Sequence, residues 1–238
     1  PIFGEMTELL TTTSTADRSV SVAVTDDNPA DGSAGVESVT LSYQLDSLTA
    51  AVNTVSLSLT SGDSESGTWM GTIPGQEVGT FVYWSLTATD VNGNTTNIST
   101  NSYFIWHATA GRDLIFWNDH NWLYSVLDYA QTVYFYWGED HFDIWDVAYG
   151  NLNDEIASNY DVIIELGMDY NLHNADDVID DWWNMTKTYI VAAGDEWLYT
   201  KYGSGDYITV PEGDVAREIL GISSFYQDIN IQHNPNNF

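Results

Sequence analysis

The chain has 238 residues, with 35 Asp and Glu against five Lys and Arg, a net charge of -30 and no cysteine. This negative charge repels phosphate backbones and anionic lipids, which excludes nucleic acid as a partner, and the lack of cysteine excludes disulfides, thiolate metal sites and thiol nucleophiles. No apolar run approaches the roughly 20 residues of a membrane span, so we expect no membrane insertion in this segment.

The first half of the chain alternates between apolar and polar residues. The period of two is clearest at 20–24, 39–45, 55–59 and 81–89, and turn-rich segments separate these runs. Such alternation is typical of half-buried strands in an antiparallel sandwich. We therefore predict a lead-in segment at 1–17 and an all-β sandwich at 18–107.

Three stretches of this half resemble a known class of module. They are "GVESVTLSYQL", "SGTWMGTIPG" and "GTFVYWSLTATDVNGN". Together they resemble the immunoglobulin-like or fibronectin type III-like modules of prokaryotic surface and secreted proteins, over about 90 residues. The resemblance implies a module that holds other parts together or apart, because that is what most modules of this kind do.

The second half of the chain follows a different pattern. Short apolar runs typical of buried parallel strands occur at 113–117, 142–147, 160–166 and 188–194. Apolar residues at helical spacing separate or follow these runs in "NWLYSVLDYAQTVYFYW", "NADDVIDDWWNM" and "EGDVAREILG". This alternation predicts a doubly wound α/β domain with a parallel sheet at 108–238.

The runs "DLIFWNDHN", "FDIWDV", "YDVIIELG" and "YIVAAGDEW" are similar to the flavodoxin-like domain of the class I glutamine amidotransferase-like superfamily. The similarity is to degenerate versions found in large secreted proteins. That superfamily carries a nucleophilic cysteine after its third strand, where this chain has Met168 and Asp169. The resemblance therefore implies an immunoglobulin-like sandwich followed by a flavodoxin-like α/β domain that has lost its catalytic thiol.

Polar residues follow three of the predicted parallel strands, where ligands bind in an open α/β sheet. They could hold a divalent cation or perform acid–base chemistry, but they could equally cap helices or lie in solvated loops, and the sequence favours the second interpretation. These candidate metal ligands are Asp119, His120, Asp169, His173, Asp195 and Glu196.

An acidic loop in the first half is a further candidate calcium site, through Asp26, Asp27 and Asp31, although an ordinary solvated turn explains it as well. Aromatic residues could stack on sugar rings, but most tryptophans, including Trp69 and Trp84, are expected in the cores. The acceptor sequence for N-glycosylation begins at Asn94, Asn97 and Asn184.

These features favour a non-enzymatic structural or interaction module of an extracellular or cell-surface assembly, such as a surface layer, a filament or an adhesin-like protein. The acidity suits saline surroundings, in which counterions screen the charge. The expected partners are copies of the chain or neighbouring domains of a longer surface protein, since the chain starts at Pro1 without an initiator Met or signal peptide. The alternatives are a Ca²⁺-binding or glycan-binding module of a secreted protein and, less favoured, a hydrolase that uses the Asp/His edge.

Overall fold

The computed structural model divides the chain into two compact units, Pro1–Ala108 (unit 1) and Thr109–Phe238 (unit 2). Each unit is described by itself. The residues that the structure describes are 1–26, 34–108, 113–117, 131–132, 134–136, 138, 142–150, 152–166, 189–193, 202, 207–218 and 221–226.

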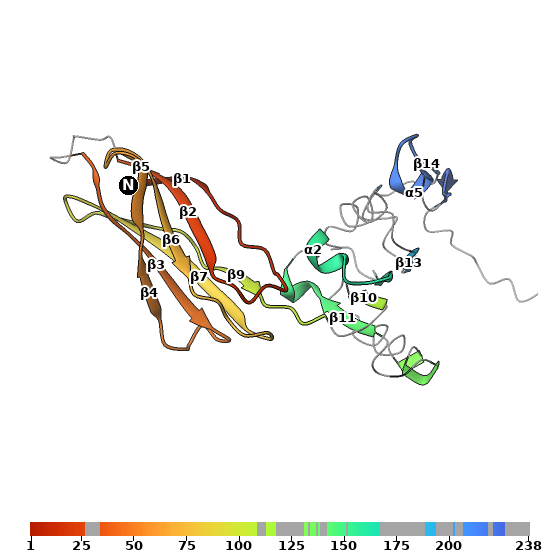
Figure 1. The fold of residues 1–238 in the computed structure, drawn as a ribbon. Helices are drawn as coiled ribbons and strands as arrows, with labels where there is room; N and C mark the ends of the chain where they lie inside the picture. Colours follow the sequence, from red (N-terminus) through yellow and green to blue (C-terminus); the bar gives the residue numbers. More distant parts are fainter. Residues whose placement is uncertain are drawn as a thin grey trace, which may run out of the picture. The chain divides into compact units, whose positions relative to one another are not determined.

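Unit 1 is built from two antiparallel sheets (Figure 1). The first sheet has the order β1-β2-β6-β5, with bounds Ile2–Met6, Arg18–Thr25, Ser66–Ile73 and Ser58–Gly62. The second has the order β4-β3-β7-β8, with bounds Asn53–Ser56, Val36–Leu45, Phe81–Asp90 and Thr95–Asn97, and β9 (Asn101–Phe104) also pairs with β7.

The alternating sequence explains the core of unit 1. Along β7 every second residue is buried, which places Val82, Trp84, Leu86 and Ala88 on the inner face. These side chains belong to one cluster that also contains the inward-facing valines of β2, so both sheets contribute to a single core. Trp69 and Trp84 are 8% and 2% exposed, which confirms the expectation that these tryptophans fill the core.

The chain enters unit 1 at one end of the sandwich and leaves it at the other (Figure 1). At the first end, the Thr96 hydroxyl donates to the backbone oxygen of Pro1 (2.7 Å), close to where β7 finishes. At the other end, Phe104 pairs with Phe81, the first residue of β7. A strand of ten residues spans roughly 30 Å, so residue 1 and residue 104 lie about that far apart.

The segment that precedes β2 connects the two sheets. Strand β1 pairs antiparallel with β2, and Thr12 then forms a parallel bridge with Ile105 beside the second sheet. Two backbone hydrogen bonds hold this bridge: the Thr12 amide donates to the Phe104 carbonyl (3.1 Å), and the Trp106 amide donates to the Thr12 carbonyl (2.8 Å). Residues 1–17 are therefore part of the sandwich.

Four strands of unit 2 pair in parallel in the order β11-β10-β12-β13. Their bounds are Phe142–Asp146, Asp113–Trp117, Val162–Leu166 and Tyr189–Ala193. Trp145 of β11 and Ile156 of the short helix α2 (Asp154–Ala157) are fully buried. A separate pair of short strands, β14 (Ile208–Thr209) and β15 (Ser224–Phe225), is antiparallel.

The prediction of a doubly wound α/β domain is wrong. In the parts that the structure describes, the chain is mostly β-sheet, and the named helices α2 (Asp154–Ala157) and α5 (Val215–Glu218) have four residues each. A doubly wound fold needs long helices over both faces of its sheet, and parallel pairing alone does not supply them. The run at 174–185, on which the helix prediction partly rested, lies outside the described residues.

The helical spacing at 212–221 led to a wrong prediction of a helix that packs on the sheet. The helix that forms there is too short to bury an apolar face. Helix α5 spans a single turn, between Gly213 and Gly221, both of which have positive φ. Isolated turns of helix are marginal without tertiary packing. No helix among the described residues is long and apolar enough to cross a membrane.

The buried Leu86 provides a test of the unit 1 core. We expect Leu86→Ala to lower the free energy of unfolding by about 2–5 kcal/mol, because the lost methyl groups leave a cavity between the sheets. Leu48, which is 57% exposed, is the matched control, and its change to alanine should cost less than about 0.5 kcal/mol. Urea unfolding followed by tryptophan fluorescence measures both, and equal effects would contradict the assigned core.

Candidate functional site

Most of the predicted site residues lie outside the part of the chain that the structure describes. The structure therefore does not place the proposed cation site at the edge of the parallel strands, nor most of the acidic loop. The residues concerned are Asp27, Asp31, Asp119, His120, Asp169, His173, Asn184, Asp195 and Glu196. Asp26, Asn94 and Asn97 are described, and all three lie at the end of unit 1 where residue 1 is found.

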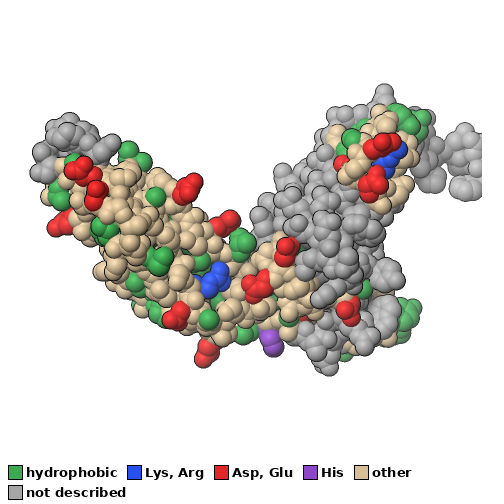
Figure 2. Space-filling view, turned by 45° about the horizontal axis from the view of Figure 1, so that its top comes forward, with side chains coloured by type: hydrophobic (Ala, Val, Ile, Leu, Met, Phe, Trp, Pro, Cys, Tyr) green, Lys and Arg blue, Asp and Glu red, His purple; other side chains and the backbone are tan. Residues whose placement is uncertain are grey.

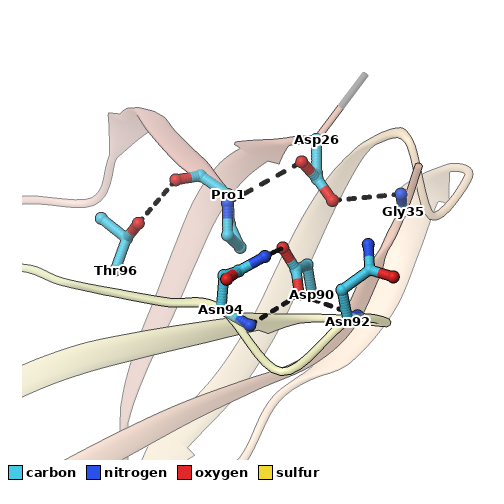
Figure 3. Close-up of polar contacts among 7 residues, drawn as sticks. All are labelled: Pro1, Asp26, Gly35, Asp90, Asn92, Asn94 and Thr96. Carbon is cyan, nitrogen blue, oxygen red and sulfur yellow. Dashed lines mark hydrogen bonds and ion pairs between the residues drawn. The ribbon is translucent and has the colours of Figure 1, made fainter. Parts of the chain in front are cut away.

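A buried carboxylate organises this end of unit 1 (Figure 3). Asp90 ends β7 and is 1% exposed, and its Oδ1 accepts hydrogen bonds from the backbone amides of Asn92 (2.9 Å) and Asn94 (2.8 Å). Its Oδ2 accepts a third from the side-chain amide of Asn94 (2.8 Å). Gly93, with φ of 86°, lets the chain turn back tightly enough to make these bonds. The carboxylate thus closes the turn between β7 and β8.

The environment of Asp90 stabilises its charged form. Burial of the carboxyl would by itself raise the pKa, but the hydrogen bonds from Asn94 and Asn92 and the nearby amino group of Pro1 outweigh it, so the pKa is lowered below its ordinary value of 3.8. Hydrogen bonds to a carboxylate favour ionisation in this way. A carboxylate held ionised by three donors is a structural anchor, and it is poorly suited to accept a proton from a substrate.

A second carboxylate lies in the same region. Asp26 follows β2 and is 8% exposed. Its Oδ2 accepts a hydrogen bond from the Gly35 amide (3.2 Å), and its Oδ1 lies 3.9 Å from the amino group of Pro1 (Figure 3). Asp26 therefore joins the two described ends of the acidic loop to the amino group that precedes β1.

The only lysine or arginine of unit 1 lies at the opposite end of the sandwich. The guanidinium of Arg18 sits over the ring of Tyr103, 5.1 Å from its centroid, and donates to the Leu10 carbonyl (3.2 Å). Burial raises the pKa of Tyr103 to about 12, against a smaller opposing effect of Arg18. The phenol therefore stays protonated at neutral pH and serves packing rather than proton transfer.

The described residues hold no group of three or more His, Asp or Glu placed to bind a metal ion. The two acceptor asparagines that the structure describes differ in their surroundings. The side-chain amide nitrogen of Asn94 donates to Asp90, whereas the side-chain oxygen of Asn97 accepts a hydrogen bond from the Thr87 hydroxyl (2.6 Å). Both asparagines are exposed, so they differ in hydrogen bonding rather than in accessibility.

Sequence reasoning did not single out Asp90 as a site residue. The signal was present in "DVNGN", where Asp is followed by Asn and Gly at the spacing of a tight turn. What the sequence did not show is that this Asp is buried beside Pro1, because that contact depends on β1 and β8 meeting at one end of the sandwich.

Comparisons with known proteins identify no family. No family model and no curated protein matches the chain. Among solved structures, a cycloalternan-forming enzyme from Listeria monocytogenes is 9% identical over 40% of this chain and 8% of its own length, with a TM-score of 0.33. A polysaccharide deacetylase from Bacillus cereus is 8% identical over 79% of this chain and 68% of its own, with a TM-score of 0.32. Likenesses this weak carry no argument about function.

The Asp90 anchor leads to a pH-dependent prediction. Because the pKa of Asp90 is lowered in the folded state, its carboxylate stabilises unit 1 at pH values above 3.8, the ordinary pKa of the group. This contribution is lost as the pH falls through the folded-state pKa. We expect Asp90→Asn to lower the urea midpoint clearly at neutral pH, with the gap to the unmodified chain narrowing in acid. The exposed Glu37→Gln is the control. A gap that widened in acid would contradict this assignment.

Proposed function

We propose that the chain is a non-enzymatic structural module of an extracellular or cell-surface assembly. The observation that carries this proposal is the path of the chain through unit 1, which enters at the Asp90 end and leaves roughly 30 Å away at the Phe104 end. A module with this path holds its own two ends apart by its full length. Spacers and linking modules need this property, and a catalytic domain does not.

The strand order supports an immunoglobulin-like identity for unit 1. If β1, β2, β3, β5, β6 and β7 correspond to strands A to F, and β8 with β9 to strand G, one sheet has the order ABED and the other contains CFG. This is the arrangement of immunoglobulin-type sandwiches, with β4 as an additional strand beside C. The parallel bridge of Thr12 to Ile105 places the first segment next to both sheets.

The charge of the chain supports assembly in salt rather than in dilute buffer. A net charge of -30 makes copies of the chain repel one another, and salt or divalent cations reduce this repulsion. We propose that its partners are further copies or neighbouring domains of a longer surface protein, and that Ca²⁺ acts between carboxylates of different copies as well as on single loops.

Sedimentation of the full chain at increasing concentration tests this function. We expect a monomer at low ionic strength and larger species in molar NaCl with CaCl₂, because screening removes the repulsion that keeps copies apart. The control is NaCl at matched ionic strength with a chelator, which separates a calcium effect from simple screening. A chain that stays monomeric under every condition, at the highest attainable concentration, would refute self-assembly.

A further inference from the structure

The outer face of the β4-β3-β7-β8 sheet is uncharged, although the chain is strongly acidic. The only charged residues of the five strands in this sheet are Glu37 and Asp90, at the ends of β3 and β7. Figure 2 shows the visible surface of unit 1 as mostly uncharged, with separate red carboxylates. The outer face between the strand ends therefore lacks the negative charge with which the rest of the chain repels other anionic molecules.

Hydroxyl groups occupy this face in rows that the strand register fixes. Thr40 of β3 lies opposite Ser56 of β4 and Thr87 of β7, and the next row pairs Ser42 with Thr54 and Ser85. Neighbouring strands lie about 4.8 Å apart, and residues i and i+2 about 6.7 Å apart, so the hydroxyls form a regular grid. We call these six residues the hydroxyl face: Thr40, Ser42, Thr54, Ser56, Ser85 and Thr87.

Aromatic rings continue the hydroxyl face along β7. Phe81 and Tyr83 point to the same side as Ser85 and are partly exposed, and their rings are nearly parallel, with centroids 6.0 Å apart and 16° between the planes. Phe104 of β9 lies beside Phe81, with 4.5 Å between ring centroids. The face thus joins a rigid apolar strip to a neutral grid of hydrogen-bonding groups.

The chemistry of this face selects one class of ligand. A serine or threonine hydroxyl both donates and accepts hydrogen bonds, so the grid complements a partner that also carries many hydroxyls. Within the grid the Thr87 hydroxyl donates to Asn97, and its oxygen can still accept. Aromatic rings add contact to the C–H faces of sugar rings. A protein partner fits less well, because serine is depleted in protein interfaces, and anionic polymers are repelled by the surrounding carboxylates. We propose that a neutral polysaccharide binds along the hydroxyl face and its aromatic strip, centred on Tyr83.

Binding to defined polysaccharides tests this site in the full chain. Laminarin and dextran serve as soluble probes by calorimetry, and cellulose and chitin as insoluble probes by co-sedimentation, with alginate as the anionic control. We expect binding to at least one neutral probe and none to alginate. Tyr83→Ala and Thr87→Asp should each weaken that binding at least about tenfold, whereas Tyr83→Phe, which keeps the ring, should retain it.

Thr72→Asp is the matched control, because Thr72 lies on β6 in the other sheet, next to the inward-facing Ile73. It adds the same charge to unit 1 and should leave binding unchanged. Urea midpoints of all four variants confirm that they fold. No binding to any neutral probe, or binding that Tyr83→Ala leaves unchanged, overturns the site.

The glycan site and the proposed assembly can fail separately. Binding is measured at low ionic strength, where we expect the chain to be monomeric, so an absence of assembly in salt does not affect the result. If sedimentation instead shows an association of copies without glycan that Thr87→Asp abolishes, the face is a contact between copies and the glycan inference is overturned.

Discussion

The packing of two apolar sheet faces against each other is the interaction on which unit 1 depends. Strand β7 is central to it, because it pairs with three other strands and contributes every second side chain to the core. A buried ionised carboxylate without partners is very costly, so the acidic residues of this unit are confined mainly to turns and strand ends.

Asp90 shows how this architecture accommodates a buried charge. Its carboxylate takes three hydrogen bonds from one turn, and the amino group of Pro1 adds a favourable charge. Asp26 is held in a similar way by Gly35 and Pro1. Both carboxylates tie loops to strands at one end of the sandwich. Of the acidic residues that the sequence offered as ligands in the acidic loop, the structure describes Asp26, and its carboxylate makes internal connections.

The sequence predicts most where one pattern decides the structure. Period-two alternation locates β2, β3 and β7, because each strand has one buried and one outer face. In the second half the short apolar runs locate the parallel strands β10 to β13, but the helical spacing between them suggested a doubly wound domain that the described residues do not form. The contact of Asp26 with Gly35 and Pro1, and the alignment of Thr40 with Thr87, depend on long-range register, which no local pattern encodes.

The bridge between Thr12 and Ile105 has a mechanical consequence. Tension applied across residues 1 and 106 would run along the strands, so the backbone hydrogen bonds that flank this bridge would be loaded in shear and would share the force. If two paired segments were instead pulled apart from one end, their hydrogen bonds would break one after another. Stretching of unit 1 along its strands is therefore opposed by both hydrogen bonds of the bridge together.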